Sequence, residues 1–294
     1  MMVGTMSTLR WGTSGDLCLA LWLLLLAHAG CLVAQAHEPL CTAQDLAADP
    51  NRPTFSFPAT TTQCGMFEVD FGWTTQDMGR GVQQNFFPAS LRYGVTPRFD
   101  LRWGVVNHIY QSGYPSLQGA GDEYLGARYM FLQQSHSVPA MAIFYQVKIP
   151  TANPAKGLGT GFTDNIFTLL VSKDLGKYHI DFNLIGTLAG AAIGHNGAVQ
   201  GDLALTRALT KKASIVLESF GGSQPGAPDR LGIELAGATY AVRPWFVLDT
   251  AYNRTYTAGT PHQQFLIGGT CTIRPPWRRE KRSQGQPALI IDSH

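Results

Sequence analysis

A two-residue alternation of apolar and polar side chains is the feature that most constrains this sequence. It is clearest between Phe87 and Val106, where two extended stretches flank a tight connection at 96–98. Alternate residues of a β-strand face opposite sides of the sheet. The sequence therefore predicts a β-hairpin with one apolar face and one charged face. A soluble sandwich or barrel would bury the apolar face, whereas a membrane barrel would turn it toward lipid.

The composition favours the membrane barrel. Only 14% of the 294 residues are charged, whereas a soluble domain carries about 25%. Aromatic residues reach 11% and glycines number 32, and beyond the N-terminus no apolar run attains the roughly 18 to 20 residues that a membrane helix needs. These properties are typical of a transmembrane β-barrel, whose strands are only half apolar. The net charge of +2 indicates no polyanionic partner, and we expect no nucleic acid.

The same alternation recurs along the chain and predicts an all-β fold, a transmembrane antiparallel up-and-down β-barrel of about 12 strands. An even number of strands brings both ends of the barrel to the same side of the membrane. The expected strands are 67–73, 87–95, 99–105, 124–131, 141–149, 167–171, 178–184, 200–206, 213–220, 231–241, 246–252 and 265–273.

The links between these strands alternate in length. Short links follow every second strand, and longer links rich in Gly, Pro, Asn and Ser are expected at 74–86, 111–122, 150–164, 190–197, 221–230 and 255–262. Outer-membrane barrels have short periplasmic turns and long external loops. We therefore expect a bacterial outer-membrane location with both termini in the periplasm. Residues 190–199 could alternatively belong to a short apolar helix.

The pattern divides the chain into four parts. Residues 1–36 resemble a signal peptide, with Arg10 before an apolar run and a small-residue cleavage site that ends at Ala36; a membrane anchor or a lipoprotein site at Cys31 are the alternatives. Residues 37–63 would form a periplasmic N-terminal segment, 64–273 the barrel, and 274–294 a disordered basic C-terminal tail. In an oxidising compartment Cys41 could bridge to Cys64, the alternative being two unpaired thiols.

The charged face must point into the lumen, because each cation turned toward the middle of the bilayer costs about 2 kcal/mol or more. The candidate lumen lining is Glu68, Asp70, Arg92, Asp100, Arg102, Arg128, Phe144, Lys148, Asp181, Glu218, Glu234 and Asp249. Such a lining could form a weakly selective constriction, or a paired network that fills a narrow interior. Phe144, with Met130, Tyr124 and Tyr240 on the same expected face, would suit an aromatic or amphipathic solute.

The sequence gives only weak evidence for a catalytic site. His179, Asp181 and Asn183 share one face of a strand, but no nucleophile motif accompanies them, and Ser172 and Ser214 lie on other strands. No spacing is typical of a metal site, and we expect neither a cofactor nor enzymatic activity.

The chain resembles the outer-membrane transporter family labelled with the meta-pathway of phenol degradation. The likeness lies in LRYGVTPRFDLR at 91–102, in Gly121-Asp122 followed by LGARY at 125–129, and in Pro139-Ala140 leading to IPT at 149–151. It covers roughly residues 64–273, and the basic tail beyond Ile273 departs from the family pattern.

The resemblance implies an outer-membrane channel for passive uptake of small organic, aromatic or hydrophobic molecules. Outer-membrane lipid, the solute and the outer-membrane assembly machinery are the partners expected; the sequence predicts no oligomeric state. The alternatives are an outer-membrane enzyme acting on lipid or lipopolysaccharide and a non-conducting structural barrel.

Overall fold

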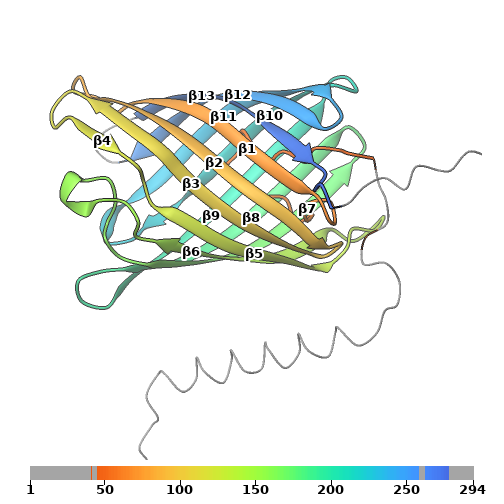
Figure 1. Cartoon of the computed structure of the whole chain (residues 1–294), viewed down its shortest axis with the longest axis horizontal. Helices are drawn as coiled ribbons and strands as arrows, with labels where there is room; N and C mark the ends of the chain where they lie inside the picture. Colours follow the sequence, from red (N-terminus) through yellow and green to blue (C-terminus); the bar gives the residue numbers. More distant parts are fainter. Residues whose placement is uncertain (1–40, 42–44, 258–261, 278–294) are drawn as a thin grey trace, which may run out of the picture. The chain divides into compact units, whose positions relative to one another are not determined.

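One antiparallel sheet closes on itself in the computed structural model, which describes residues 41, 45–257 and 262–277 (Figure 1). Its strands are β1 (Phe67–Asp77), β2 (Gln83–Thr96), β3 (Phe99–Ser112), β4 (Leu117–Gly119), β5 (Glu123–Leu132), β6 (Ala140–Ile149), β7 (Asp164–Leu175), β8 (Tyr178–Gly190), β9 (His195–Ala208), β10 (Ala213–Gln224), β11 (Ala227–Arg243), β12 (Phe246–Thr257) and β13 (His262–Ile273). A single turn of 3₁₀ helix, η1 (Pro154–Lys156), lies between β6 and β7.

The ring closes where β1 pairs with both β2 and β13, and β2 pairs with β3. The short strand β4 pairs with β3 alone and stands outside the ring. The predicted antiparallel barrel of twelve strands is therefore confirmed. Among the described residues, no helix is long and apolar enough to cross a membrane.

The strands are longer than the alternation predicted, and most of the extra residues lie at the end of the barrel with the long links. The link after β8 shortens to 191–194 and the link after β10 to 225–226. The helical alternative for 190–199 is wrong, because β9 begins at His195 and pairs with β8. In these strand ends a few apolar residues, such as Leu188 and Val199, are scattered among glycines and polar residues. The alternation is therefore irregular, and the strand ends resemble loops in the sequence.

The outside of the barrel is apolar and the inside is polar. Large side chains such as Phe71, Leu101 and Phe182 are between 41% and 47% exposed, whereas Glu68 and Arg92 are fully buried. This distribution is the reverse of that in a soluble barrel and is the one that a lipid bilayer requires.

Strand β11 faces the opposite way from the prediction. Glu234 and Tyr240 were expected in the lumen, but both are exposed on the outer wall, while Ile233 and Leu235 point inward. Leu235 belongs to an apolar cluster inside the barrel that contacts Phe55. The inward face of β11 is apolar because it packs against protein instead of water.

Residues 45–63, here called the inner segment, run inside the barrel (Figure 1, orange-red). They contribute no strand to the sheet. They enter at the end where the links are shortest, since the Ala48 amide donates to the Pro244 carbonyl (2.8 Å) and the Thr61 hydroxyl to the Pro97 carbonyl (2.9 Å). Both β1 and β13 have an end there, because Phe67 pairs with Ile273. The predicted signal peptide lies outside the described residues, as does the tail beyond residue 277.

Candidate functional site: the lumen of the barrel

The structure places all of the predicted lining residues except Glu234 on the inner wall, where each is at most 8% exposed. They come from strands β1, β2, β3, β5, β6, β8, β10 and β12. Inward-facing positions are brought together by the antiparallel register, so that charges distant in the chain become cross-strand neighbours.

The first group of charges forms ion pairs across β1, β2, β3 and β5. Arg92 lies opposite Glu68 in the register, and its Nη2 is 2.9 Å from Glu68 Oε1 and 3.1 Å from Asp70 Oδ1. Arg128 lies opposite Asp100 and donates to its carboxylate. Buried charges are tolerated when they are paired and hydrogen-bonded, and these four strands supply the pairing within the wall itself.

The same charges bind the backbone of the inner segment. Asp49 donates its amide to Glu68 (2.9 Å), and Thr62 donates its amide to Asp100 (2.7 Å). In return, Arg92 donates to the Asp49 carbonyl (3.0 Å) and Arg128 to the Pro58 carbonyl (2.8 Å). A buried backbone without strand pairing needs such partners, and charged side chains provide the strongest ones.

The opposite wall holds the middle of the segment. Glu218 on β10 accepts the amides of Phe55 (2.9 Å) and Ser56 (2.7 Å). Asn183 on β8 both accepts from the Phe57 amide (2.8 Å) and donates to the Phe57 carbonyl (2.9 Å). The Arg52 guanidinium pairs with Asp249 on β12 at 3.2 Å. The segment is thus tied to strands on both sides of the lumen.

Two phenylalanines of the segment fill apolar spaces in the lumen. Phe57 packs edge-to-face on Phe144, with ring centroids 5.3 Å apart, and Phe55 lies 5.8 Å from the ring of Phe220. The Arg102 guanidinium lies over both Phe57 (4.6 Å) and Phe144 (5.4 Å), within the range of a cation–π interaction.

The ends of the segment are fixed covalently. Cys41 and Cys64 are joined by a disulfide, with Cα atoms 5.4 Å apart, which closes a loop of sequence separation 23 around the segment. The backbone of Cys64 also forms an isolated β-bridge with Gly94 of β2.

Lys148 forms a separate ionic group with Asp122 and Asp164. Its Nζ is 2.6 Å from Asp164 Oδ2 and 2.8 Å from the hydroxyl of Thr160, which belongs to the link 150–163. The Asp122 carboxylate accepts the amide of Ala152 in the same link at 3.0 Å. This lysine therefore ties the link to the inner wall.

A cavity of about 310 Å³ remains beside the inner segment. It is bounded by residues 49–58 and by strands β8 to β12, and it is lined by both acidic and basic side chains, among them Asp181, Lys211 and Lys212. Its size lies at the lower end of the range for small-molecule sites.

His179 and Asp181 have a serine beside them. Ser172 Oγ donates to Asp181, and the His179 ring nitrogens contact Asp181 (3.0 Å) and Asp174 (2.6 Å). A nucleophilic serine would instead contact the histidine. Ser172 also accepts the Ala59 amide (2.7 Å) and is 2% exposed, so the cluster holds the inner segment and has no nucleophile in position. In the described part of the chain, no group of three or more His, Cys, Asp or Glu residues is arranged to hold a metal ion.

Sequence reasoning leaves open whether residues 37–63 fill the lumen, and it does not identify Ser172 as a contact with the inner segment. One signal was present: in residues 50–58, Phe55 and Phe57 lie between Pro53 and Pro58, and Pro50 precedes them. Proline has no amide to donate to a neighbouring strand in the middle of a sheet. An aromatic stretch that contains several prolines is therefore suited to packing against the barrel wall without becoming one of its strands.

The comparisons with known proteins support the fold. No family model and no curated protein matches the chain. Among solved structures, the COG4313 outer membrane channel from Pseudomonas putida F1 is similar at 13% identity and a TM-score of 0.58, over 76% of this chain and 99% of that chain.

Two further solved structures are more distant. The KdgM porin is 9% identical with a TM-score of 0.48, over 69% of this chain and 98% of that one. The CymD monoaromatic hydrocarbon channel is 10% identical with a TM-score of 0.39, over 73% and 89%.

Proposed function

We propose that the protein is a bacterial outer-membrane channel for passive passage of small organic molecules, and that the inner segment closes its lumen in the described state. One observation carries the proposal: the segment is held by side chains of the wall and by no strand pairing. Moving it breaks no hydrogen bond of the sheet, so the barrel can open while its fold is kept.

Several charges of the wall form ion pairs with other residues of the wall. Arg92 stays paired with Glu68 and Asp70, and Arg128 with Asp100, whether or not the segment is present. Asp249 would lose its partner Arg52, and Glu218 would lose the amides of the segment. Water entering the lumen could hydrate these carboxylates. A hydrogen bond to a charged group contributes about 1.5 to 3 kcal/mol, so a few of them keep the closed state dominant.

The side chains that would border the opened path favour aromatic or hydrophobic solutes. Phe144 and Arg102 currently contact Phe57, and a solute ring could take the place of that phenylalanine. This agrees with the substrate class implied by the family resemblance. Both termini would be periplasmic, because the inner segment enters at the end with the short links.

Solute uptake by liposomes carrying the refolded full-length protein tests the proposal. We expect phenolic compounds to enter faster than sugars and amino acids of similar size. Glu218→Gln should raise uptake roughly fivefold, since weakening its two bonds to the segment by about 1 kcal/mol shifts the population by that factor. Asp229→Asn, which removes an exposed carboxylate on β11, is the control and should leave uptake unchanged.

Absence of uptake by both the wild type and Glu218→Gln would contradict the channel and favour a non-conducting structural barrel. Turnover of lipid that is lost in His179→Ala would instead favour an enzyme.

A further inference from the structure

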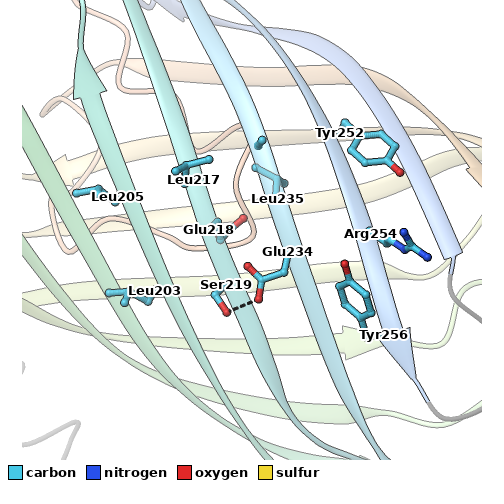
Figure 2. A pocket seen from close by; sticks show the side chains of 11 residues that line it. Leu203, Leu205, Leu217, Glu218, Ser219, Glu234, Leu235, Tyr252, Arg254 and Tyr256 are labelled. Carbon is cyan, nitrogen blue, oxygen red and sulfur yellow. Dashed lines mark hydrogen bonds between the residues drawn. The ribbon is translucent and has the colours of Figure 1, made fainter.

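A hollow of about 610 Å³ lies on the outer wall over β9 to β12 (Figure 2). Most of its side chains point away from the lumen, and Leu203, Leu217 and Tyr256 are between 50% and 59% exposed. Glu218 and Leu235, which also border the hollow, face inward. In a membrane-spanning barrel this surface faces lipid, so the hollow is distinct from the lumen and from the proposed solute path.

Three glycines lie in the row of outward positions next to the hollow. Gly201, Gly221 and Gly232 occupy paired outward positions on β9, β10 and β11, and the row ends at Tyr256 on β12. A Cβ at Gly201 would meet no atom within 4 Å. The neighbouring strands thus leave out their side chains at one level, which makes room for a ligand.

The next row contains two opposite charges that do not pair with each other. Glu234 and Arg254 are direct cross-strand neighbours on the outer face, yet no ion pair joins them in the described structure. Glu234 accepts the Ser219 hydroxyl at 2.9 Å, and the Arg254 guanidinium lies 5.4 Å from the ring centroid of Tyr256. Figure 2 shows the carboxylate turned toward Ser219 and the guanidinium turned away from it.

The following row is apolar, with Leu205, Leu217, Ala236 and Tyr252 paired across the four strands. It lies further from the strand ends at Thr257 than the charged row does. The hollow therefore changes from polar to apolar in the direction of the bilayer centre, as a lipid does from headgroup to chain.

We propose that this hollow binds one lipid whose headgroup carries both a phosphate and a primary amine. The phosphate binds Arg254, the amine binds Glu234, and an acyl chain lies over Leu217 and Leu205. Charge complementarity selects this occupant: charged side chains that face lipid are destabilising to a degree that depends on depth, and a headgroup with both signs compensates both Glu234 and Arg254. The inference depends on membrane insertion and does not depend on solute passage.

Native mass spectrometry of the full-length protein in detergent tests the proposal, with phosphatidylethanolamine, phosphatidylglycerol and phosphatidylcholine of identical chains in competition. We expect the wild type to retain one phosphatidylethanolamine in preference, by roughly tenfold or more, the value of one charge-assisted hydrogen bond. Arg254→Gln should weaken retention of phosphatidylethanolamine and phosphatidylglycerol alike. Glu234→Gln should abolish only the preference between them.

Two further variants sharpen the test. Gly201→Leu should block retention without altering any charge. Arg207→Gln removes an outward arginine of β9 that also lies over a tyrosine ring, 5.6 Å from Tyr178, and should retain lipid as the wild type does. Solute uptake should be the same in all four variants, so that a failure of the lipid site is distinguishable from a failure of the channel.

Equal retention of the three lipids by the wild type would overturn the proposal. So would Glu234→Gln and Arg254→Gln proteins that behave like Arg207→Gln. Dimers of the wild type that disappear in both variants, without lipid preference, would overturn it in favour of a second copy of this chain.

Discussion

Leu101 and Arg102 are adjacent in β3 and face opposite environments. Leu101 is 47% exposed on the outer wall, whereas Arg102 is 8% exposed and contacts the rings of Phe57 and Phe144. Leu101→Arg would place a cation against lipid, at a cost that reaches about 2 to 4 kcal/mol at the bilayer midplane. Arg102→Leu removes a charge that forms no ion pair among the described residues and should be tolerated.

We therefore expect Leu101→Arg to lower the yield of folded barrel more strongly than Arg102→Leu does. The heat-modifiable band on gels measures that yield. Equal yields from the two variants would mean that the assignment of inner and outer faces in β3 is wrong.

The individual lining residues show how far the sequence can predict the site. Arg92, Asp100 and Arg128 were placed correctly because turning them toward lipid is costly. Glu234 was misplaced by the same rule, because the inner face of β11 is apolar where Leu235 packs beside Phe55. The rule assumes a lumen filled with water or charge, and it fails where the chain itself supplies an apolar partner.

Among the elements, the disulfide between Cys41 and Cys64 limits how the inner segment can move. A cross-link that closes a loop of this length stabilises by about 3 kcal/mol, and here the loop contains the segment. Cys41→Ser frees the upstream end while Cys64 remains beside Gly94. We expect this variant to fold as a barrel and to take up solute faster than the wild type.

A reductant should raise uptake by the wild type toward that of Cys41→Ser and leave the variant unchanged. If the reductant changes both proteins equally, it acts elsewhere and the disulfide does not restrain the segment.

The strands themselves were predictable where one face meets lipid. The alternation predicts β2 and β3, but for Ala227 to Arg230, the start of β11, the sequence predicts a loop. These four residues are all exposed, so burial imposes no alternation on them. Sequence patterning therefore locates the membrane-facing part of each strand and misses its extension.

At the scale of the whole molecule, the inner segment and the barrel should behave as two cooperative units. The amides of Phe55, Phe57 and Thr62 are bonded to side chains of the wall, whereas the strand amides belong to a closed sheet. The hydrogen bonds of the segment amides can break when the segment moves within the barrel. The hydrogen bonds of the strand amides can break only when the barrel unfolds. A periodic pattern reports the sheet alone, so the alternation by itself does not reveal what occupies the lumen.

Hydrogen–deuterium exchange measures this difference directly. We expect peptides covering residues 45–63 to exchange more slowly than the link 191–194 and faster than β10. Glu218→Gln should accelerate exchange in the segment roughly fivefold, the effect of about 1 kcal/mol, and leave β10 exchange unchanged outside the substituted position. If the segment and the strands exchanged at one common rate in both proteins, the lumen would open only when the barrel unfolds. The protein could then not conduct in its folded state, whatever solutes the lining would accept.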